Sequence, residues 1–378
     1  MYLRLHHKMI KVLSVFGTRP EATKMVPLML SLQNHPQIDS KICVTAQHRE
    51  LLDQVISPFG IEPEYDLNIM SKNQTLTDVV TRILQGMAPI LAEIKPDILL
   101  VHGDTATSFA AALAAYYAKV PVGHVEAGLR TYDKYRPYPE EINRKLNTGL
   151  ADLHFAPTEQ TKQNLLKENV PADTIFITGN TAIDLIKYTV KENYVFNRKA
   201  LNNLDFTKRI ILMTAHRGEN KGQAMEEICR AVSRLINDHS DTFLVWPMHP
   251  NNAAVAPAKA ILGEHERVLL TDAIDVFDMH NIMTRTHLLL TDSGGLQEEA
   301  PSFDLPTVVL REVTERPEGQ AAGTLVVAGV KEGTIYNEAA RLLTDKAAYK
   351  KMAAVPNPFG DGNASERIVD AILRNYIK

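Results

Sequence analysis

A chain of 378 residues is longer than one ordinary hydrophobic core allows and predicts about two domains. Hydrophobic residues make up 45% and charged residues 23%, the balance typical of a soluble globular protein. The net charge of −4 argues against nucleic-acid binding, because there is no basic excess to neutralise a phosphate backbone.

The sequence offers no candidate for a membrane anchor. The best apolar run, from Phe109 to Ala118, is about half of the ~20 residues that a spanning helix needs. Residues 1–8 lack the apolar core of a secretory signal and precede the first predicted strand, so we expect them to be a dispensable extension. Cys43 and Cys229 lie in apolar contexts without a CxxC pair, which predicts buried free thiols and a cytoplasmic protein.

Short β-branched or leucine-rich runs alternate with amphipathic helical stretches along the chain. Such runs, separated by helices, predict parallel sheets made of βαβ units, and two series of them predict two doubly wound, Rossmann-like α/β domains. The expected strands are 10–16, 40–45, 97–102, 121–125, 152–156 and 174–178 in the first series, and 209–214, 242–246, 267–270, 286–291, 306–310 and 324–327 in the second.

The boundary between the two domains is predicted near a polar segment. Residues 193–208 show little apolar periodicity and follow a predicted helix, 181–192. We therefore expect a first domain at 9–180 and a second at 181–364. The last predicted helix, 365–377, is expected to cross back to the first domain.

Polar side chains follow several predicted strands in the first half. Arg19 and Lys24 form a cation pair beside a helix start, which suits an anionic ligand, although a solvated first turn is the more common explanation for a single basic residue. Asp104 follows the strand 97–102 and could be a helix N-cap or a carboxylate in a cleft.

Three acids could form a catalytic cluster. Glu126 ends an apolar strand close to a glycine, where a rigid strand would hold it for general acid/base work. Glu140 and Glu141 follow a proline, and helix capping explains one of them and leaves the other free. If Asp104, Glu126 and Glu140 converge, their crowding would raise at least one pKa toward neutrality.

The second half contributes histidines at strand ends. His216, followed by Arg217, could shuttle protons or contact a phosphate, and His249 follows the strand 242–246 in a similar way. The histidines at 48, 102, 124, 216 and 249 match no HxxxH or HExxH spacing, so no metal is expected.

The most informative segment is 288–299, which predicts a buried strand, a turn of small residues and a helix start. The backbone N–H groups of Ser293, Gly294 and Gly295 could bind a phosphate, and Glu299 could accept hydrogen bonds from ribose hydroxyls. An ordinary tight turn is the alternative. Because ligands of doubly wound sheets bind beyond the carboxyl ends of strands, we expect both halves to face one interdomain cleft.

Two nucleotide fingerprints are absent. No GxGxxG follows any predicted strand, and no GxxxxGK[ST] occurs. A bound nicotinamide and an ATP-hydrolysing P-loop are therefore not expected, and no cofactor is predicted.

Taken together, the motifs resemble those of the bacterial non-hydrolysing UDP-N-acetylglucosamine 2-epimerases. The resemblance runs in family order from about residue 10 to the C-terminus. It is carried by the segments 16–21, 47–50, 102–105, 125–130, 139–141, 216–217, 291–300 and 314–319.

This resemblance implies a GT-B-like fold, a homodimer without a cofactor, and interconversion of UDP-GlcNAc and UDP-ManNAc that supplies ManNAc for cell-surface polysaccharide. It implies that UDP is eliminated to give 2-acetamidoglucal and then added back. Asp104, Glu126, Glu140 and His216 match the catalytic groups. The residues matched or expected to bind the substrate and UDP are Arg19, Lys24, Arg217, Ser293, Gly294, Gly295, Glu299 and Arg316.

The resemblance also implies an allosteric site for a second UDP-GlcNAc, for which Gln47, His48, Glu50 and His249 are the candidates. Many family members carry a basic residue where this chain has Asn73, and a second arginine where it has Gly218. We therefore expect weaker or altered activation.

Three other functions compete with epimerisation. One is a GT-B glycosyltransferase that uses UDP-GlcNAc and an acceptor. Another is a hydrolysing epimerase that releases free ManNAc and UDP. The third is a non-catalytic sensor of UDP-sugars, in which the carboxylates would only cap helices.

Overall fold

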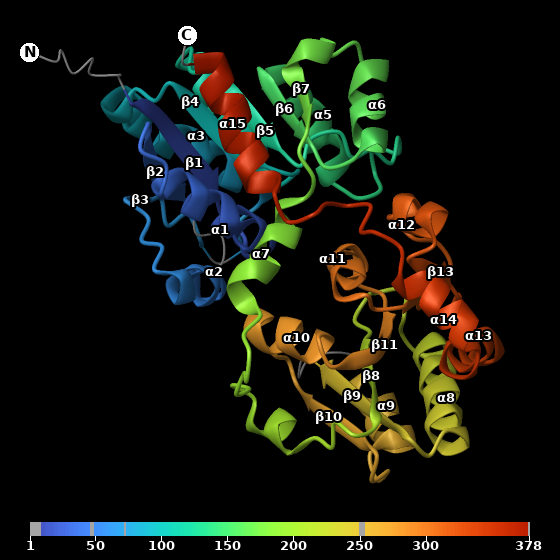
Figure 1. The fold of residues 1–378 in the computed structure, drawn as a ribbon. Coiled ribbons are helices and arrows are strands. Elements are labelled where there is room, and N and C mark those ends of the chain that lie inside the picture. Colours follow the sequence, from blue (N-terminus) through green and yellow to red (C-terminus); the bar gives the residue numbers. More distant parts are fainter. Residues whose placement is uncertain (1–8, 46–48, 72, 249–253, 377–378) are drawn as a thin grey trace, which may run out of the picture. The chain divides into compact units, whose positions relative to one another are not determined.

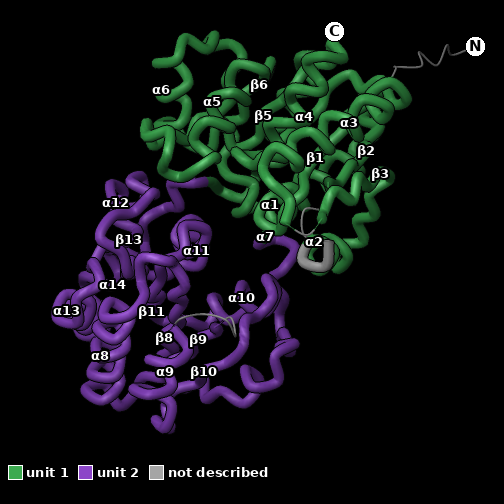
Figure 2. The backbone as a smooth tube through the Cα atoms, turned by 180° about the vertical axis from the view of Figure 1, so that it is seen from behind, with its two compact units in different colours: residues 1–185, 360–378 green, residues 186–359 purple. Residues whose placement is uncertain are grey.

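The computed structural model describes residues 9–45, 49–71, 73–248 and 254–376. The chain divides into two compact units, residues 1–185 with 360–378, and residues 186–359 (Figure 2). Within the described ranges, no helix is long and apolar enough to cross a membrane.

The first unit is a seven-stranded parallel sheet with helices between its strands (Figure 1). The strand order is β3-β2-β1-β4-β5-β6-β7. Its elements are β1 (Ile10–Phe16), α1 (Arg19–Gln33), β2 (Ile38–Val44), α2 (Arg49–Ile56), η1 (Ser57–Phe59), β3 (Tyr65–Asp66), α3 (Leu76–Ile94), β4 (Ile98–His102), α4 (Ala106–Tyr117), β5 (Val122–Val125), α5 (Glu140–Leu150), β6 (Leu153–Ala156), α6 (Glu159–Lys167), η2 (Ala172–Thr174), β7 (Ile175–Ile177) and α15 (Ala364–Tyr376). The helix α7 (Thr181–Thr189) begins in this unit and ends in the second.

The second unit is a six-stranded parallel sheet with the order β10-β9-β8-β11-β12-β13. Its elements are η3 (Lys199–Asn203), β8 (Arg209–Thr214), α8 (Gln223–Asp238), β9 (Thr242–Met248), α9 (Val255–Leu262), β10 (Val268–Asp272), α10 (Val276–Met283), β11 (Thr286–Thr291), α11 (Gly294–Glu299), η4 (Ala300–Phe303), β12 (Thr307–Val309), α12 (Pro317–Ala322), β13 (Leu325–Val327), α13 (Glu332–Thr344) and α14 (Lys346–Ala353). Both sheets and all twelve predicted strands are confirmed within a few residues, and the short β3 was not predicted.

Each sheet is covered on its faces by apolar helix surfaces. In the first unit, α3 and α4 pack on β1 and β4 through a cluster that includes Ile83, Ala111 and Leu99. In the second, α8, α9 and α13 share one cluster with the sheet, and the other cluster contains Phe196 and Leu201. The polar segment 193–208 is therefore part of the core of the second unit.

The last helix belongs to the first unit. α15 packs against α1, and its first turn is capped by the buried Asp184. The Asp184 carboxylate accepts hydrogen bonds from the backbone N–H groups of Ala364 at 3.0 Å and Ser365 at 2.6 Å. These bonds satisfy donors that a helix start leaves without partners.

Candidate active site

Several of the candidate residues lie where the strand order of a sheet reverses. In the first sheet the reversal lies between β1 and β4, and in the second between β8 and β11. Loops at the carboxyl ends of such neighbouring strands form the usual ligand site of a doubly wound sheet. Arg19 begins the helix that follows β1, and Asp104 lies in the loop after β4. The loops after β8 and β11 contain His216 and Ser293.

Glu126 directly follows β5 and has a left-handed backbone, with φ of 62°. This conformation costs a non-glycine residue about 1–2 kcal/mol. Its side chain is only 9% exposed; Oε1 forms an ion pair with the Lys24 ammonium and accepts a hydrogen bond from Asn180 Nδ2 at 3.3 Å. Strain at a buried, polar residue is a recognised mark of a functional position.

His102, the last residue of β4, lies beside Glu126, with 3.6 Å between its Nε2 and Glu126 Oε2. Burial lowers the pKa of His102 to about 4, against the attraction of Glu126, so the imidazole is neutral at pH 7. It is a site residue that the sequence pattern did not indicate. The next residue, Gly103, has φ of 62°, and an added Cβ would lie 3.3 Å from Glu126 Oε2, so glycine brings the loop close to this carboxylate.

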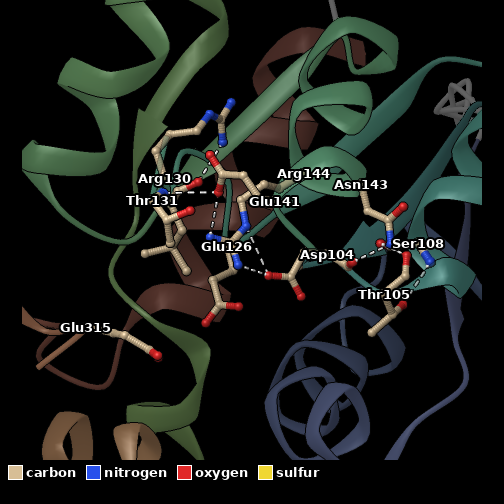
Figure 3. Close-up of polar contacts among 12 residues, drawn as sticks. Asp104, Thr105, Ser108, Glu126, Arg130, Thr131, Glu141, Asn143, Arg144 and Glu315 are labelled. Carbon is tan, nitrogen blue, oxygen red and sulfur yellow. Dashed lines mark hydrogen bonds and ion pairs between the residues drawn. The ribbon is translucent and has the colours of Figure 1, made fainter. Parts of the chain in front are cut away.

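Asp104 is held by Arg144 of α5 rather than by a helix start (Figure 3). Arg144 donates to Asp104 Oδ2 through Nη2 and, at 3.1 Å, through Nε. The N-cap of α4 is Thr105, so the alternative of Asp104 as N-cap is wrong. Burial raises the pKa of Asp104, and the charges of Glu126 and Glu140 raise it further, against the pull of Arg144. The three acids are therefore close enough to act on one another electrostatically.

The adjacent acids at the start of α5 have different roles. Glu141 is fully buried and accepts hydrogen bonds from the backbone N–H groups of Thr131 at 3.0 Å and Tyr132 at 2.9 Å, and from Arg144 at 3.2 Å (Figure 3). Glu140 Oε2 is also shielded from solvent, but it has no hydrogen-bond partner within the described ranges. Glu141 thus organises the loop, and Glu140 is the acid left for chemistry.

The two basic residues of α1 are placed differently. Arg19 is exposed, and its guanidinium has no partner in the part of the chain that the structure describes. Lys24 is bound to Glu126, so the structure places it within the carboxylate cluster. Glu21 fixes the turn before them: its buried carboxylate accepts from Thr18 N at 2.8 Å and from Thr105 Oγ1 at 2.7 Å.

In the second unit, His216 lies beside a buried carboxylate that the sequence pattern did not single out. His216 Nδ1 is 3.2 Å from Asp292 Oδ1, and the imidazole is about half exposed. The backbone N–H groups of His216 and Arg217 both donate to Asp292 Oδ2 at 2.8 Å. Arg217 Nε is buried and has no hydrogen-bond partner among the described residues.

The turn after β11 leads into a helix as predicted, but one of its three expected phosphate donors is already used. Gly294 and Gly295 begin α11, and their N–H groups have no partner within the helix. The N–H of Ser293, however, donates to Thr291 Oγ1 at 3.0 Å, so it is not the free donor that we expected.

Arg316 lies against this turn. An added Cβ on Gly294 would be 3.2 Å from Arg316 Nη2, and Glu298 holds the guanidinium through a 2.5 Å hydrogen bond to Nε. Glu299, the last residue of α11, is held by the buried His280, whose Nε2 is 3.3 Å from Glu299 Oε2. The turn therefore brings a guanidinium, helix-start N–H groups and a carboxylate together.

The candidates for the allosteric site lie mostly beyond what the structure shows. Gln47, His48 and His249 fall outside the described residues, as does the side chain of Glu50. Among the residues that are described, no group of three or more His, Cys, Asp or Glu side chains could hold a metal ion.

Comparisons with known proteins agree with one another. The family model described as UDP-N-acetylglucosamine 2-epimerase matches residues 30–373. A UDP-N-acetylglucosamine 2-epimerase of Bacillus subtilis is 52% identical over 98% of this chain and 96% of its own length. The crystal structure of the Neisseria meningitidis UDP-GlcNAc 2-epimerase bound to UDP-GlcNAc is 45% identical, with a TM-score of 0.88 over 97% of this chain and all of that one.

A glycosyltransferase of kitacinnamycin has the same fold at low identity. It is 11% identical, with a TM-score of 0.68 over 97% of this chain and 99% of that one. This likeness concerns the fold alone. With the epimerase structure, it confirms the prediction of a GT-B-like architecture.

Proposed function

This chain belongs to the UDP-N-acetylglucosamine 2-epimerase family, and from that premise we propose that it inverts C2 of UDP-GlcNAc by eliminating UDP and adding it back. The observation that carries the mechanism is the set of three acids, Asp104, Glu126 and Glu140, at one edge of the first sheet. The reaction interconverts UDP-GlcNAc and UDP-ManNAc, and UDP is eliminated and added back during each turnover.

The chemistry of the substrate favours elimination. The C2 hydrogen is not α to a carbonyl group, so direct removal would leave an unstabilised carbanion. Loss of the C2 proton together with the C1–O bond gives instead a neutral alkene, 2-acetamidoglucal, and UDP. Protonation of C2 from the other face, with return of UDP to C1, gives UDP-ManNAc. The route needs a base, an acid and groups that bind and stabilise UDP as the leaving group.

The acids of the first unit have different electrostatic surroundings. The ammonium of Lys24 stabilises the ionised carboxylate of Glu126, which suits a base. Burial raises the pKa of Asp104, against the lowering effect of Arg144, and this is the direction that suits an acid. Two carboxyl groups whose environments push their protonation apart are the usual arrangement for acid/base catalysis. Glu140 is the third member, with one oxygen still unpartnered among the described residues.

The second unit provides the groups for UDP. Gly294, Gly295 and the guanidinium of Arg316 suit the diphosphate, and Glu299 suits the ribose hydroxyls. His216, Arg217 and the side chain of Ser293 are further candidates for binding the leaving group. The exposed Arg19 of the first unit is a further candidate for binding the substrate.

Further properties of the family extend this proposal. They are a homodimer, a cytoplasmic location and delivery of ManNAc units to cell-surface polysaccharide. Activation by a second UDP-GlcNAc is expected to be weak or altered, because Asn73 and Gly218 stand where many relatives have cations.

The elimination step can be tested with UDP-GlcNAc that carries oxygen-18 between C1 and the β-phosphorus. Cleavage of the C1–O bond frees the β-phosphate to rotate, so re-addition moves part of the label to non-bridging positions. We expect phosphorus NMR of the recovered UDP-GlcNAc to show this scrambling while UDP-ManNAc accumulates. A label that stays in the bridge while UDP-ManNAc forms would rule out elimination.

The same incubation separates the competing functions. A hydrolysing epimerase would release free ManNAc and UDP in equal amounts. A glycosyltransferase would leave UDP-GlcNAc unchanged until an acceptor is added, and a sensor would leave it unchanged throughout.

A further inference from the structure

His216 and Asp292 follow two strands that are paired side by side. Thr214 of β8 is the register partner of Thr291 of β11, and the two hydroxyls are 2.7 Å apart. The backbone N–H of Asp292 donates to Thr214 O at 3.2 Å, which continues the pairing beyond the strands. The two strands therefore fix the backbone positions of His216 and Asp292 relative to each other before any side-chain contact is made.

The two oxygens of Asp292 have separate surroundings. The side chain is fully buried. Oδ2 accepts three hydrogen bonds, from the backbone N–H groups of His216 and Arg217 at 2.8 Å and from Asn220 Nδ2 at 3.0 Å. Oδ1 lies within ion-pair distance of His216 Nδ1, at 3.2 Å, and accepts no hydrogen bond of standard geometry from the described residues.

These surroundings keep Asp292 ionised. Burial by itself would raise the pKa of Asp292, but the His216 side chain and the backbone N–H groups of Arg217 and His216 hold it below its ordinary value. A buried carboxylate beside a histidine nitrogen is stable when that nitrogen carries a proton to donate.

We propose that Asp292 is a positioning residue for His216, holding the imidazole with its proton on Nδ1 and leaving Nε2 as the nitrogen that faces the substrate. The proposal rests on the function proposed above, in which His216 acts on the leaving group or substrate. Nε2 is available for this role, because it makes no hydrogen bond with the residues that the structure describes. Asp292 itself, being fully buried, acts through His216.

A purely structural role for Asp292 explains only half of its contacts. The bonds to Oδ2 shape the turn 215–220, and an amide oxygen could accept them equally well. Oδ1 contributes nothing to that turn. Its one polar neighbour among the described residues is the imidazole, so the charge on this oxygen is what an Asp292→Asn variant would change.

The Asp292→Asn variant separates the two roles. The amide oxygen of the new asparagine must face the backbone N–H groups of His216 and Arg217. The opposite orientation would put the amide NH₂ group, a donor, against these N–H groups, which are also donors. The amide nitrogen then faces His216 Nδ1 and turns it into an acceptor, which moves the imidazole proton to Nε2. The turn is kept, and the tautomer of His216 is reversed.

Nitrogen NMR of the full-length protein with labelled histidine reads the tautomer directly. The His216 signal is identified by its absence in His216→Gln. We expect the Nδ1–H form in the native protein and the Nε2–H form in Asp292→Asn. We also expect kcat for UDP-GlcNAc to fall by about 10²- to 10⁴-fold, mainly without a change in KM. An Nε2–H form in the native protein would overturn the proposal without any variant.

A matched control and a double variant complete the test. Asn220→Ser removes the amide that donates to Oδ2 and to Leu310 O, and it leaves the imidazole untouched, so the tautomer and kcat should stay close to native. In the His216→Gln background, Asp292→Asn should cost nothing more, whereas additive losses would show that Asp292 is merely structural. Near-native kcat in Asp292→Asn beside an inactive His216→Gln would refute the proposal. An active His216→Gln would instead refute the proposed role of His216, while the tautomer still reports what Asp292 does.

Discussion

Replacing Glu126 with glutamine should abolish most turnover and leave UDP binding intact. The glutamine side chain has nearly the same shape and keeps an oxygen for Lys24 and Asn180, but it cannot take up or return a proton. We expect kcat to fall by about 10²- to 10⁴-fold, the usual contribution of a positioned acid or base. Steady-state kinetics measures the loss, and calorimetry measures the affinity for UDP.

A charge-matched control comes from the same unit. Glu93 of α3 is exposed and accepts a hydrogen bond from the hydroxyl of Tyr65 at 2.8 Å. Glu93→Gln therefore removes the same charge without touching the carboxylate cluster, and its kinetics should match those of the native protein. Native turnover in Glu126→Gln would remove Glu126 from the mechanism.

The neighbouring acids Glu140 and Glu141 should respond in opposite ways to the same substitution. Glu140→Gln should lower kcat by about 10²- to 10⁴-fold with little change in the melting temperature, because no hydrogen bond of Glu140 Oε2 is lost among the described residues. Glu141→Gln should reduce the free energy of unfolding by about 1–3 kcal/mol, because one of the buried donors that Glu141 binds is left unmatched.

Thermal unfolding and kinetics of the two variants decide this assignment. Each variant is the control for the other, since the residues are adjacent and the substitution is identical. A stable, native-like Glu141→Gln beside an unstable Glu140→Gln would reverse the roles that we assign. Full turnover in Glu140→Gln would leave only two acids for the reaction.

The sheets could be predicted from the sequence because buried parallel strands are continuous apolar runs. β3 was missed because Tyr65 and Asp66 are too few and too polar to form such a run. The acidic residues that follow strands could also be predicted as site candidates, since a charged residue is unusual directly after an apolar strand. Asp292 also directly follows an apolar strand, β11, but the glycine turn after it is the stronger indication of a ligand site.

The hydrogen-bond and ion-pair partners of these side chains could not be predicted from the sequence. The contact between Lys24 and Glu126 joins residues 102 positions apart, so no local pattern indicates it. The preceding proline predicted a helix at Glu140 and Glu141, but only the fold shows which carboxylate the loop at Thr131 uses. Similarly, the sequence predicts His102 only as the end of a strand. The pairing of β4 with β5 in the fold is what brings it next to Glu126.

We propose that the carboxylates of the first unit transfer the proton at C2 and that groups of the second unit retain UDP. This division of roles explains why Glu126 is kept in a strained backbone conformation beside a cation. It also agrees with the lack of a dinucleotide fingerprint in the sequence, since the proposed reaction needs no electron carrier. In the proposed mechanism, one proton leaves C2, and a new proton is added to C2 by an acidic side chain whose own proton exchanges with solvent.

The most direct test is therefore to incubate the protein with UDP-GlcNAc alone in heavy water and follow C2 by proton NMR. We expect UDP-ManNAc to appear with deuterium at C2, without release of free ManNAc and without an acceptor. UDP-ManNAc that keeps its original hydrogen at C2, or free ManNAc as the product, would contradict the proposed mechanism.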